Sequence, residues 1–464
     1  MRQFIGHYHS DPNQRQVQIA ALLAGAIKRH QNYHLSEAEQ AYRRILQIEP
    51  EHPEALHLLG VIAHQKDNHQ EALQLISRAI KIEPQNPRFH NNLGLAFEAL
   101  DQTSDAIQSY QEAVRLDPKY ADACNNLGNA LNKEGQFDAA IAILHKAIHL
   151  IPQMPEAHLN LANALADKGD LQAAVDHYQQ AINQKPDYDK AYNNLGNVLK
   201  DLGQIDAAIK NFRKAIEIKP NYPGALNNLG NALRAKDRTD DAIKIFRQAI
   251  DQSADSAESY CHLGNAFKDQ GEFESALRHY RQAIQMKPDF AEAHFNASIV
   301  HLLKGDFSKG WKEYEWRLQR EEWKTICCRR ADLPRWDGES FIGKRLCVYD
   351  EQGFGDTLQF VRYLPLVKTR GGEVIFETRK ALIGLLNDFP GIDDLVERLS
   401  YDQPAADADL YISLLSLPGI FNTRLETIPH NIPYLSAEHE KVKYWRRRLG
   451  ENGFKVGVVW AGQP

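Results

Sequence analysis

Apolar and polar positions follow one pattern that returns every 34 residues over most of the chain. NNLGNAL at residues 125–131 occurs again at 227–233, and NNLGNVL stands at 193–199. Within these copies the leucines stand four residues apart, which is the spacing of one apolar face of a helix. A second segment with helical spacing follows each copy. The pattern therefore predicts a series of helix pairs.

Several columns keep this register. A small residue follows the leucine at Gly60, Gly94, Gly128, Ala162, Gly196, Gly230, Gly264 and Ser298. Alanine marks the second helix, and four residues beyond it stand Tyr42, Ile76, Tyr110, Leu144, Tyr178, Phe212, Phe246, Tyr280 and Tyr314. Small residues let two helices approach closely, and prolines between the pairs end one helix and begin the next. A 34-residue helix-turn-helix unit with these columns is typical of the tetratricopeptide repeat (TPR).

The register extends over about nine repeats. An N-terminal extension at 1–18 precedes repeats at 19–324, and Gly310 replaces the second-helix alanine in the last repeat, as expected where a stack ends. IAALLAGAI at 19–27 could also be a secretory apolar segment, but it lacks a small-residue cleavage site and falls in register. The predicted fold of this part is an α-helical TPR solenoid, coiled as a right-handed superhelix.

Composition narrows the possible partners and the compartment. The net charge is -6 and no dense basic run occurs, so we expect no nucleic-acid partner. No apolar run approaches the roughly 20 residues of a membrane span. Five cysteines without CxxC spacing indicate a reducing, cytoplasmic location. His30 and His34 share a helical face without a third ligand, so no metal site is predicted.

Asparagine fills two columns of the first helix. With the Leu-Gly pair at positions 7 and 8 and about 100° of rotation per residue, positions 2, 5, 6, 9 and 13 share one arc opposite the leucines. This arc is predicted to be the exposed, concave lining of the superhelix. Position 6 holds Asn92, Asn126, Asn160, Asn194, Asn228 and Asn296, and position 9 holds Asn129, Asn163, Asn197, Asn231 and Asn265.

Two interpretations of these asparagines are open. A row of amides, which donate and accept, can bind the backbone of an extended peptide or protein in the concave groove without selecting its side chains. Alternatively, the amides bond between adjacent helices. A clamp for a C-terminal carboxylate would need Lys or Arg in this arc. Position 2 instead is mostly acidic and reads Glu54, Arg88, Asp122, Glu156, Lys190, Gly224, Glu258 and Glu292. No such clamp is predicted.

Beyond Gly310 the period stops, and short apolar runs alternate with helical segments. RLCVY at 345–349 predicts a buried strand, followed by a glycine turn and a helix over 357–369. VIFET, LVER and DLYISLL predict further strands, and RKALIGLLNDF and VKYWRRRL predict further helices. Alternating strands and helices imply a parallel sheet covered on both faces. We therefore expect a linker at 325–342 and an α/β domain at 343–453.

The turn after the first strand, DEQGFGD at 350–356, is the candidate ligand loop, because ligands gather at the carboxyl ends of parallel strands. Gly353 and Gly355 permit close backbone approach, and Glu351 and Gln352 lie beside them. The loop lacks the third glycine of a dinucleotide fingerprint and the lysine of a P-loop. Asp356 is expected either to be the N-cap of the following helix or to face a cleft.

These segments carry a resemblance to a known family. WKEYEWRL, PRWDGE, EQGFGDTLQF and KVGVVWAGQP are similar to segments of bacterial TPR proteins that bear a heptosyltransferase-like glycosyltransferase domain, and the repeats resemble those of protein O-GlcNAc transferases. The resemblance implies the Rossmann-like N-terminal lobe of a GT-B fold and inverting transfer from a nucleotide sugar, which is a substrate rather than a cofactor. It also implies a protein or glycan acceptor, a catalytic base at Asp356 that takes the acceptor's proton, and a substrate loop at 351–355.

KVGVVWAG resembles the first strand of the second lobe, which supplies most of the donor site in that family. The sequence ends at Pro464, directly after this strand at 454–464, so we expect the donor lobe to be missing and this chain to be inactive alone. Two hypotheses follow. The protein is a glycosyltransferase whose repeats recruit an acceptor, or a non-catalytic interaction scaffold with a vestigial half-domain.

Overall fold

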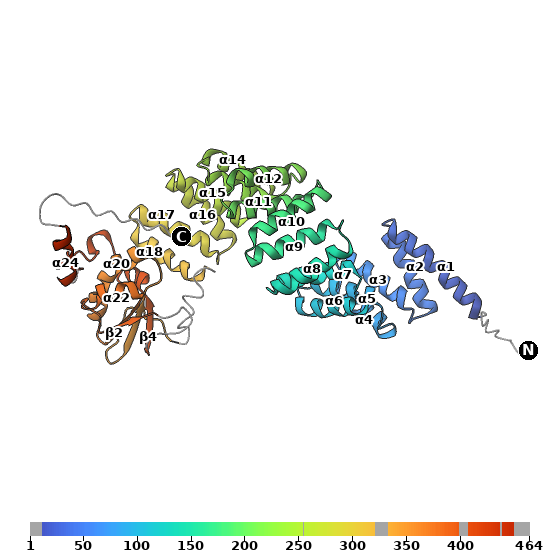
Figure 1. The fold of residues 1–464 in the computed structure, drawn as a ribbon, viewed down its shortest axis with the longest axis horizontal. Coiled ribbons are helices and arrows are strands. Elements are labelled where there is room, and N and C mark those ends of the chain that lie inside the picture. Colours follow the sequence, from blue (N-terminus) through green and yellow to red (C-terminus); the bar gives the residue numbers. More distant parts are fainter. Residues whose placement is uncertain (1–11, 254, 321–332, 399–406, 437–438, 450–464) are drawn as a thin grey trace, which may run out of the picture. The chain divides into compact units, whose positions relative to one another are not determined.

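A computed structural model describes residues 12–253, 255–320, 333–398, 407–436 and 439–449 (Figure 1). The chain divides into two compact units, residues 1–238 and 239–464. This division falls inside the repeat array. The last repeats therefore belong to the same unit as the sheet.

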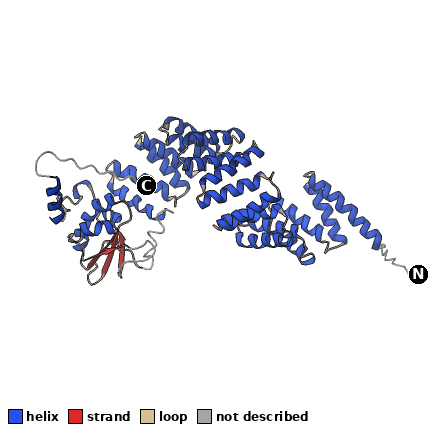
Figure 2. Ribbon diagram, in the orientation of Figure 1, coloured by secondary structure: helices blue, strands red, loops and turns tan. Residues whose placement is uncertain are grey.

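The first unit is entirely helical in the described residues (Figure 2). Successive helices pair within each repeat and contact the helices of the next repeat. Its helices are α1 Pro12–Gln31, α2 Leu35–Ile48, α3 Pro53–Gln65, α4 His69–Ile82, α5 Pro87–Glu98, α6 Thr103–Leu116, α7 Ala121–Lys133, α8 Phe137–Leu150, α9 Pro155–Lys168, α10 Leu171–Gln184, α11 Asp189–Asp201, α12 Ile205–Ile218 and α13 Pro223–Arg234. The helix α1 begins at Pro12, so it includes residues that the sequence assigns to the N-terminal extension.

Each turn inside a helix pair contains one residue in the left-handed region. Nine such residues stand 34 apart, with φ between 56° and 97°. A left-handed residue after a helix lets the chain reverse while the last carbonyls still receive hydrogen bonds. Glycine or aspartate fills the column at all but its first position: Tyr33, Asp67, Asp101, Gly135, Gly169, Gly203, Asp237, Gly271 and Gly305.

The small-residue column lets the two helices of a repeat touch. A Cβ added at Gly128 would lie 2.4 Å from Cγ of Leu144 in the second helix, and one at Gly94 would lie 2.5 Å from Cε1 of Tyr110. The large second-helix side chains are completely buried at Tyr110 and Leu144. This column therefore carries the packing inside each helix pair.

The second unit begins with the remaining repeat helices and ends with a small α/β layer. Its repeat helices are α14 Thr239–Gln252, α15 Ala257–Asp269, α16 Phe273–Met286, α17 Ala291–Leu303 and α18 Phe307–Tyr314, followed by the 3-10 turn η1 Glu315–Gln319. The strands β1 Arg345–Tyr349, β2 Glu373–Thr378, β3 Asp394–Glu397 and β4 Leu410–Ser413 form one parallel sheet in the order β3-β2-β1-β4. The four predicted strands and their parallel arrangement are confirmed.

Short helices connect the strands: α20 Phe354–Phe360, η3 Val361–Tyr363, α21 Leu364–Lys368, α22 Lys380–Leu386, η4 Leu414–Ser416, α23 Leu417–Ile420 and η5 Leu425–Thr427, with α24 His439–Leu449 at the end of the described part. Helix α20 begins at Phe354, three residues before the predicted start. Its amino end is therefore formed by the ligand loop itself.

The sheet core extends into the last repeat. Val348, Phe376 and Ile412 of the strands are completely buried in one cluster with Tyr314 of α18, and Trp311 packs against that cluster. Helices α21 and α22 contribute Leu364, Val367, Leu382 and Leu386 to the same cluster. The last repeat and the sheet therefore share one hydrophobic core.

Some of the sequence predictions concern residues that the structure does not describe. The strand expected at 454–464, the cysteine pair Cys327 and Cys328, and residues 325–332 of the linker expected at 325–342 lie outside the described residues. Cys124, Cys261 and Cys347 are buried thiols without disulfide bonds. Among the described helices, none is long and apolar enough to cross a bilayer.

Candidate functional site

A groove of about 520 Å³ lies in the first three repeats. Its first-helix side chains come from repeat positions 2, 6, 9 and 13 among others, which are columns that the sequence assigns to the inner wall. From those columns the groove is lined by Ile27, Gln31, Glu54, Leu58, Gln65 and Arg88. The predicted arc therefore borders a real concavity in this part of the first unit.

Polar side chains in this groove are held by one another. Glu54 and Arg88 form an ion pair of 3.5 Å. His30 donates from Nε2 to Gln65 over 3.0 Å and accepts from the Tyr42 hydroxyl over 3.4 Å. Burial, assisted by the Glu54 carboxylate, raises the pKa of Tyr42 to about 12. The groove thus offers apolar surface at Leu58 and Ile27 beside fixed polar groups.

The asparagines at position 6 bond to the repeat before them. Asn126 donates to Asn91 over 3.0 Å, and each partner lies 35 residues earlier. The same contact joins Asn160 to Asn125 over 2.9 Å and Asn228 to Asn193 over 3.0 Å. Asn92 donates to Nε2 of His57 over 2.7 Å. We call this series the amide ladder.

Position 5 supplies the acceptors of the ladder and is not part of an exposed lining. Asn91, Asn125 and Asn193 are buried, whereas the sequence places this column on the exposed arc. The close approach of successive first helices covers these amides, which explains the difference. In the fifth repeat position 5 is Leu159, which cannot accept a hydrogen bond, and Asn194 donates instead to Asn163 over 3.0 Å.

The asparagines at position 9 are half-buried and have varied partners. Asn129 donates to Glu98 over 3.1 Å, and Asn163 and Asn265 each accept a hydroxyl, from Tyr178 and Tyr280, over 2.7 Å. Asn231 also has a partner. Within the described residues Asn197 has none, so its whole amide is available to a ligand.

Asn296 differs from the other position-6 asparagines because it is buried. It donates to Glu292 over 3.2 Å and to the sulfur of Cys261 at 3.7 Å. Cys261 occupies position 5 of the preceding repeat, so the ladder continues in the second unit with a thiol as acceptor. A peptide could reach Asn92, Asn126, Asn160, Asn194 and Asn228 more readily than Asn296, because those five are half-exposed.

The carboxyl edge of the sheet contains a buried carboxylate that joins three strands. Asp350 follows β1, has no solvent exposure, and accepts from Thr378 at the end of β2 over 2.8 Å. Arg379 donates to it over 3.2 Å, and Arg398, which follows β3, donates to its other oxygen. Both carboxylate oxygens of Asp350 thus accept from buried or half-buried donors. Asp350 is therefore a structural anchor of this edge.

Glu351, assigned by the sequence to the substrate loop, is completely buried and lies beside Arg317 of η1. The two form an ion pair of 2.6 Å, and Arg317 also donates to Glu315 over 3.0 Å and to Ser416 over 2.9 Å. Burial opposes the charge of Arg317, but the Glu351 and Glu315 carboxylates outweigh it and raise the pKa of Arg317. Glu351 thus connects the ligand loop to the last repeat.

Asp356 lies at the third position of α20 and is not its N-cap. Gly353 is the N-cap, and the Asp356 carboxylate accepts from the Gly353 backbone N–H over 3.0 Å. This contact satisfies a donor that the helix itself leaves free. The Asp356 side chain remains half-buried, and Gly355 beside it is open, with nothing within 4 Å of an added Cβ.

The other loop residues make the remaining contacts of this edge. Gln352 donates to the Tyr314 hydroxyl over 3.2 Å, and its carbonyl accepts from Arg379 over 2.5 Å. The Arg379 guanidinium also lies over the Phe354 ring, 4.3 Å from its centre. Sequence reasoning singled out neither Asp350 nor Arg317. In the sequence, the feature that marks Arg317 is its position as a basic residue among the aromatic residues of WKEYEWRL. No local sequence pattern identifies Arg398 as a partner of Asp350.

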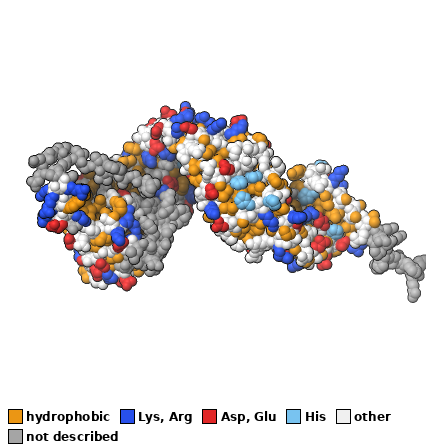
Figure 3. Space-filling model, viewed as in Figure 1, with side chains coloured by type: hydrophobic (Ala, Val, Ile, Leu, Met, Phe, Trp, Pro, Cys, Tyr) orange, Lys and Arg blue, Asp and Glu red, His pale blue; other side chains and the backbone are white. Residues whose placement is uncertain are grey.

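Histidine side chains gather on the face of the repeats shown in Figure 3. Nδ1 of His158 lies 3.1 Å from Nδ1 of His177, and their rings stack with centres 5.4 Å apart. Burial lowers the pKa of both, and the neighbouring histidines lower that of His177 further. No cluster of three or more metal-ligand side chains occurs in the part of the chain that the structure describes.

Comparisons with known proteins agree on the repeats. Models of the tetratricopeptide repeat match residues 30–94 and 223–289, and a TPR repeat model matches 99–135, 128–169, 162–203 and 196–236. Together these ranges include more than half of the chain and end at residue 289.

Similar proteins cover the chain in part. Protein FlbA of Caulobacter vibrioides is 28% identical over 151 residues, 28% of this chain and 25% of FlbA, so the chain spans about a quarter of that relative. The crystal structure of the APC/C hetero-tetramer Cut9-Hcn1 aligns at 18% identity with a TM-score of 0.47, covering 57% of this chain and 52% of that chain. YrrB, described as a TPR protein with an unusual peptide-binding site, aligns at 23% identity with a TM-score of 0.35, covering 43% of this chain and 99% of YrrB.

Proposed function

Since the chain is a tetratricopeptide repeat protein, we propose that it is a protein-interaction scaffold that binds an extended peptide of a partner along the first helices of its repeats. The groove of about 520 Å³ in the first three repeats is the observation that supports this function most directly. Two of the columns that line it, positions 6 and 9, continue through most of the later repeats as asparagine. Such a surface can hold a peptide backbone through amides and take side chains in the groove.

The ladder leaves the side-chain oxygen of Asn126 for this purpose, whereas the oxygens of Asn92 and Asn194 each already accept one hydrogen bond, from Asn91 and Asn193. The nitrogen of Asn126 is used within the stack, whereas its oxygen has no donor among the described residues. The amide of Asn197 has no hydrogen-bond partner on either side in the part of the chain that the structure describes. We therefore propose that Asn126 at position 6 supplies an acceptor to the peptide backbone and that Asn197 supplies both a donor and an acceptor. These roles are compatible with the inter-repeat bonds.

Binding of a random-sequence peptide array by the purified protein tests the proposal. Asn197→Ala should weaken peptide binding about fivefold, which is the effect of losing one hydrogen bond. Arg88→Gln should also weaken peptide binding, because Arg88 lines the groove. Asn183→Ala is the matched control, because Asn183 lies exposed on the second helix α10 and, among the described residues, accepts from Gln179 alone. Peptide binding that is absent, or equally strong in all three variants, would refute the groove as the binding surface.

A second candidate function is sugar transfer, which rests on the resemblance of the loop and on one geometric feature. The Asp356 carboxylate lies at the carboxyl edge of the parallel sheet, where ligands of such sheets bind, and the Gly353 N–H orients it. One oxygen remains to take a proton from the hydroxyl of a protein or glycan acceptor. We propose Asp356 as that base, within a Rossmann-like lobe of the GT-B type, with the open backbone at Gly355 beside the acceptor.

Release of nucleoside diphosphate from a panel of nucleotide sugars tests this role. Where such release is measured, Asp356→Asn should lower its rate by about a hundredfold or more, because the acceptor hydroxyl then lacks its base. An unchanged rate in Asp356→Asn would remove Asp356 from the chemistry.

A further inference from the structure

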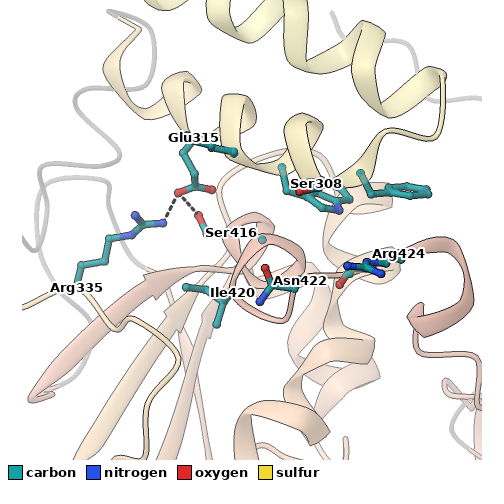
Figure 4. Close-up of a pocket in the computed structure, with 12 residues that line it drawn as sticks. Ser308, Glu315, Arg335, Ser416, Ile420, Asn422 and Arg424 are labelled. Carbon is teal, nitrogen blue, oxygen red and sulfur yellow. Dashed lines mark hydrogen bonds and ion pairs between the residues drawn. The ribbon is translucent and has the colours of Figure 1, made fainter.

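A pocket of about 420 Å³ lies between α18 and the segment that follows β4. Phe307, Trp311 and Lys312 of α18 line this pocket. Ile420 and Arg424, from the segment after β4, line it as well and lie across from Ser308 of α18 (Figure 4). We call it the junction pocket. It is separate from the groove in the first repeats, and all the elements that form it belong to the second unit.

The polar base of the junction pocket is internally neutralised. Glu315 points toward Arg335 and Ser416 (Figure 4), accepts from both, and also accepts from Arg317 over 3.0 Å. Arg317 in turn is paired with Glu351. Two carboxylates are thus matched by two guanidinium groups. This network holds its charges in place before any ligand arrives.

Two further cationic side chains line the pocket without a carboxylate partner among the described residues. Lys312 and Arg424 are both exposed, and among the described residues neither has an ion pair. The neighbouring Lys309, which does not line the pocket, is paired with Asp306 at 3.0 Å. The junction pocket therefore carries an excess of two positive charges, which favours an anionic occupant.

Aromatic side chains supply the rest of the wall. The Trp311 ring stacks near Phe307, with centres 6.4 Å apart, and meets Tyr314 edge-on at 5.8 Å. These contacts fix the indole on the pocket wall. The volume lies within the range of about 300–1,000 Å³ that small-molecule sites occupy, and it exceeds what a bare phosphate needs. The anion should therefore carry an apolar, planar part.

We propose that the junction pocket binds a small organic phosphate, with a planar ring against Trp311 and Phe307 and the phosphate between Lys312 and Arg424. This site does not depend on peptide binding by the repeats. A doubly charged phosphate matches the two unpaired cations, and the rings match the organic part. The occupant is a free small molecule, because the pocket has the size of a small-ligand site rather than that of a protein interface.

Isothermal titration of the full chain with phenyl phosphate tests the proposal. Binding should be measurable, and Lys312→Gln and Arg424→Gln should each weaken it about fivefold, because each removes one exposed charge contact. Both side chains are exposed, so neither change disturbs the core. Lys309→Gln, on the same helix, is the matched control and should bind like the unaltered protein.

Three outcomes would overturn the assignment. Undiminished binding in both variants would show that the phosphate lies elsewhere. Inorganic phosphate binding as tightly as phenyl phosphate would show that the rings contribute nothing. A phosphotyrosine peptide binding more tightly than phenyl phosphate would assign the pocket to a protein partner instead. Neutral benzyl alcohol should not bind measurably, because it lacks the charge that the two cations attract.

Discussion

Asn126 donates its side-chain N–H to the side-chain oxygen of Asn91, 3.0 Å away and 35 residues earlier in the chain. Its neighbour Asn125 accepts from Asn160, 35 residues later, over 2.9 Å. One Asn-Asn pair thus serves two interfaces, one with the repeat before it and one with the repeat after it. This explains why the doublet returns with the repeat and why both of its members are amides.

The amide ladder predicts a difference between two asparagines of the same inner wall. Asn126→Ala should lower the free energy of unfolding by about 1 kcal/mol, because it leaves the buried oxygen of Asn91 without a donor. Asn197→Ala should change it by much less, because Asn197 has no partner among the described residues. Urea denaturation followed by circular dichroism compares the two. Equal losses in both variants would contradict the ladder.

His57 should make the repeats sensitive to acid. Burial, followed by the charges of Arg88 and His30, lowers the pKa of His57 to about 3, whereas an unfolded histidine titrates near 6.5. Between these values the unfolded chain binds a proton that the folded chain does not, so the free energy of unfolding falls as the pH falls. From pH 7 to pH 5 the loss should be about 2 kcal/mol.

The variant His57→Asn isolates this contribution. Asparagine is the residue found at the same position of the next two repeats, and its oxygen can accept from Asn92 as His57 does. Unfolding at pH 7 and at pH 5 should therefore differ less in this variant than in the unaltered protein. His439→Asn, at an exposed position of α24, should leave the pH dependence unchanged. An identical pH dependence in His57→Asn would refute the assignment.

Removing one partner of the Arg317–Glu351 pair should lower the free energy of unfolding strongly, whereas replacing both partners by apolar residues should change it little. Arg317→Met leaves a completely buried carboxylate without its partner and should destabilise the second unit by about 3–5 kcal/mol. The double variant Arg317→Met, Glu351→Met should recover most of this loss, because two apolar side chains need no partners. Tryptophan fluorescence during urea denaturation reports on this core through Trp311 and Trp336.

A surface pair gives the control for this experiment. Arg43 and Glu39 lie 2.8 Å apart, but Arg43 is 52% exposed, so Arg43→Met should cost less than about 1 kcal/mol. A double variant at Arg317 and Glu351 that is as unstable as the single variant would contradict this prediction. It would show that the two side chains stabilise the core in ways other than neutralising each other's charge.

Two glycines in first helices should respond oppositely to alanine. Gly128→Ala places a Cβ 2.4 Å from Leu144 and should destabilise the repeat by about 1–3 kcal/mol. Gly224→Ala, near the start of α13, places a Cβ 3.5 Å from Tyr222 and should stabilise it by about 0.5–1 kcal/mol, because alanine favours the helix. Thermal denaturation distinguishes the two signs. A stabilising Gly128→Ala would show that the helix pair is not tightly packed there.

The repeats could be predicted in detail because each contacts mainly its neighbours. Local spacing identifies the small-residue column of Gly128 and the columns that line the first groove, whereas the contact of Gly128 with Leu144 inside one helix pair comes from the structure. The alternating runs after residue 343 were enough to predict four parallel strands. The left-handed turn column was equally periodic but was not recognised, because aspartate stands in for glycine at Asp67, Asp101 and Asp237.

The candidate site at the sheet was predictable only in its position. The glycine turn after β1 marks the edge where ligands bind, but the roles of its side chains depend on distant partners. Glu351 is buried by Arg317, and Asp350 is bound by Arg398, 48 residues later. No periodic pattern links such pairs. Asp356 was predicted to be either an N-cap or a cleft residue, and the hydrogen bond from Gly353 places it one turn into the helix.

By itself, the sequence determined the helix pairs, their register and the parallel strands, because those features follow from the spacing of apolar and small residues along one segment. Only the tertiary structure decided which amides face each other, which acids are buried, and that the last repeat shares a core with the sheet. These relationships depend on distances between segments that meet only after folding, and a hydrogen bond or ion pair is decided by a few tenths of an ångström.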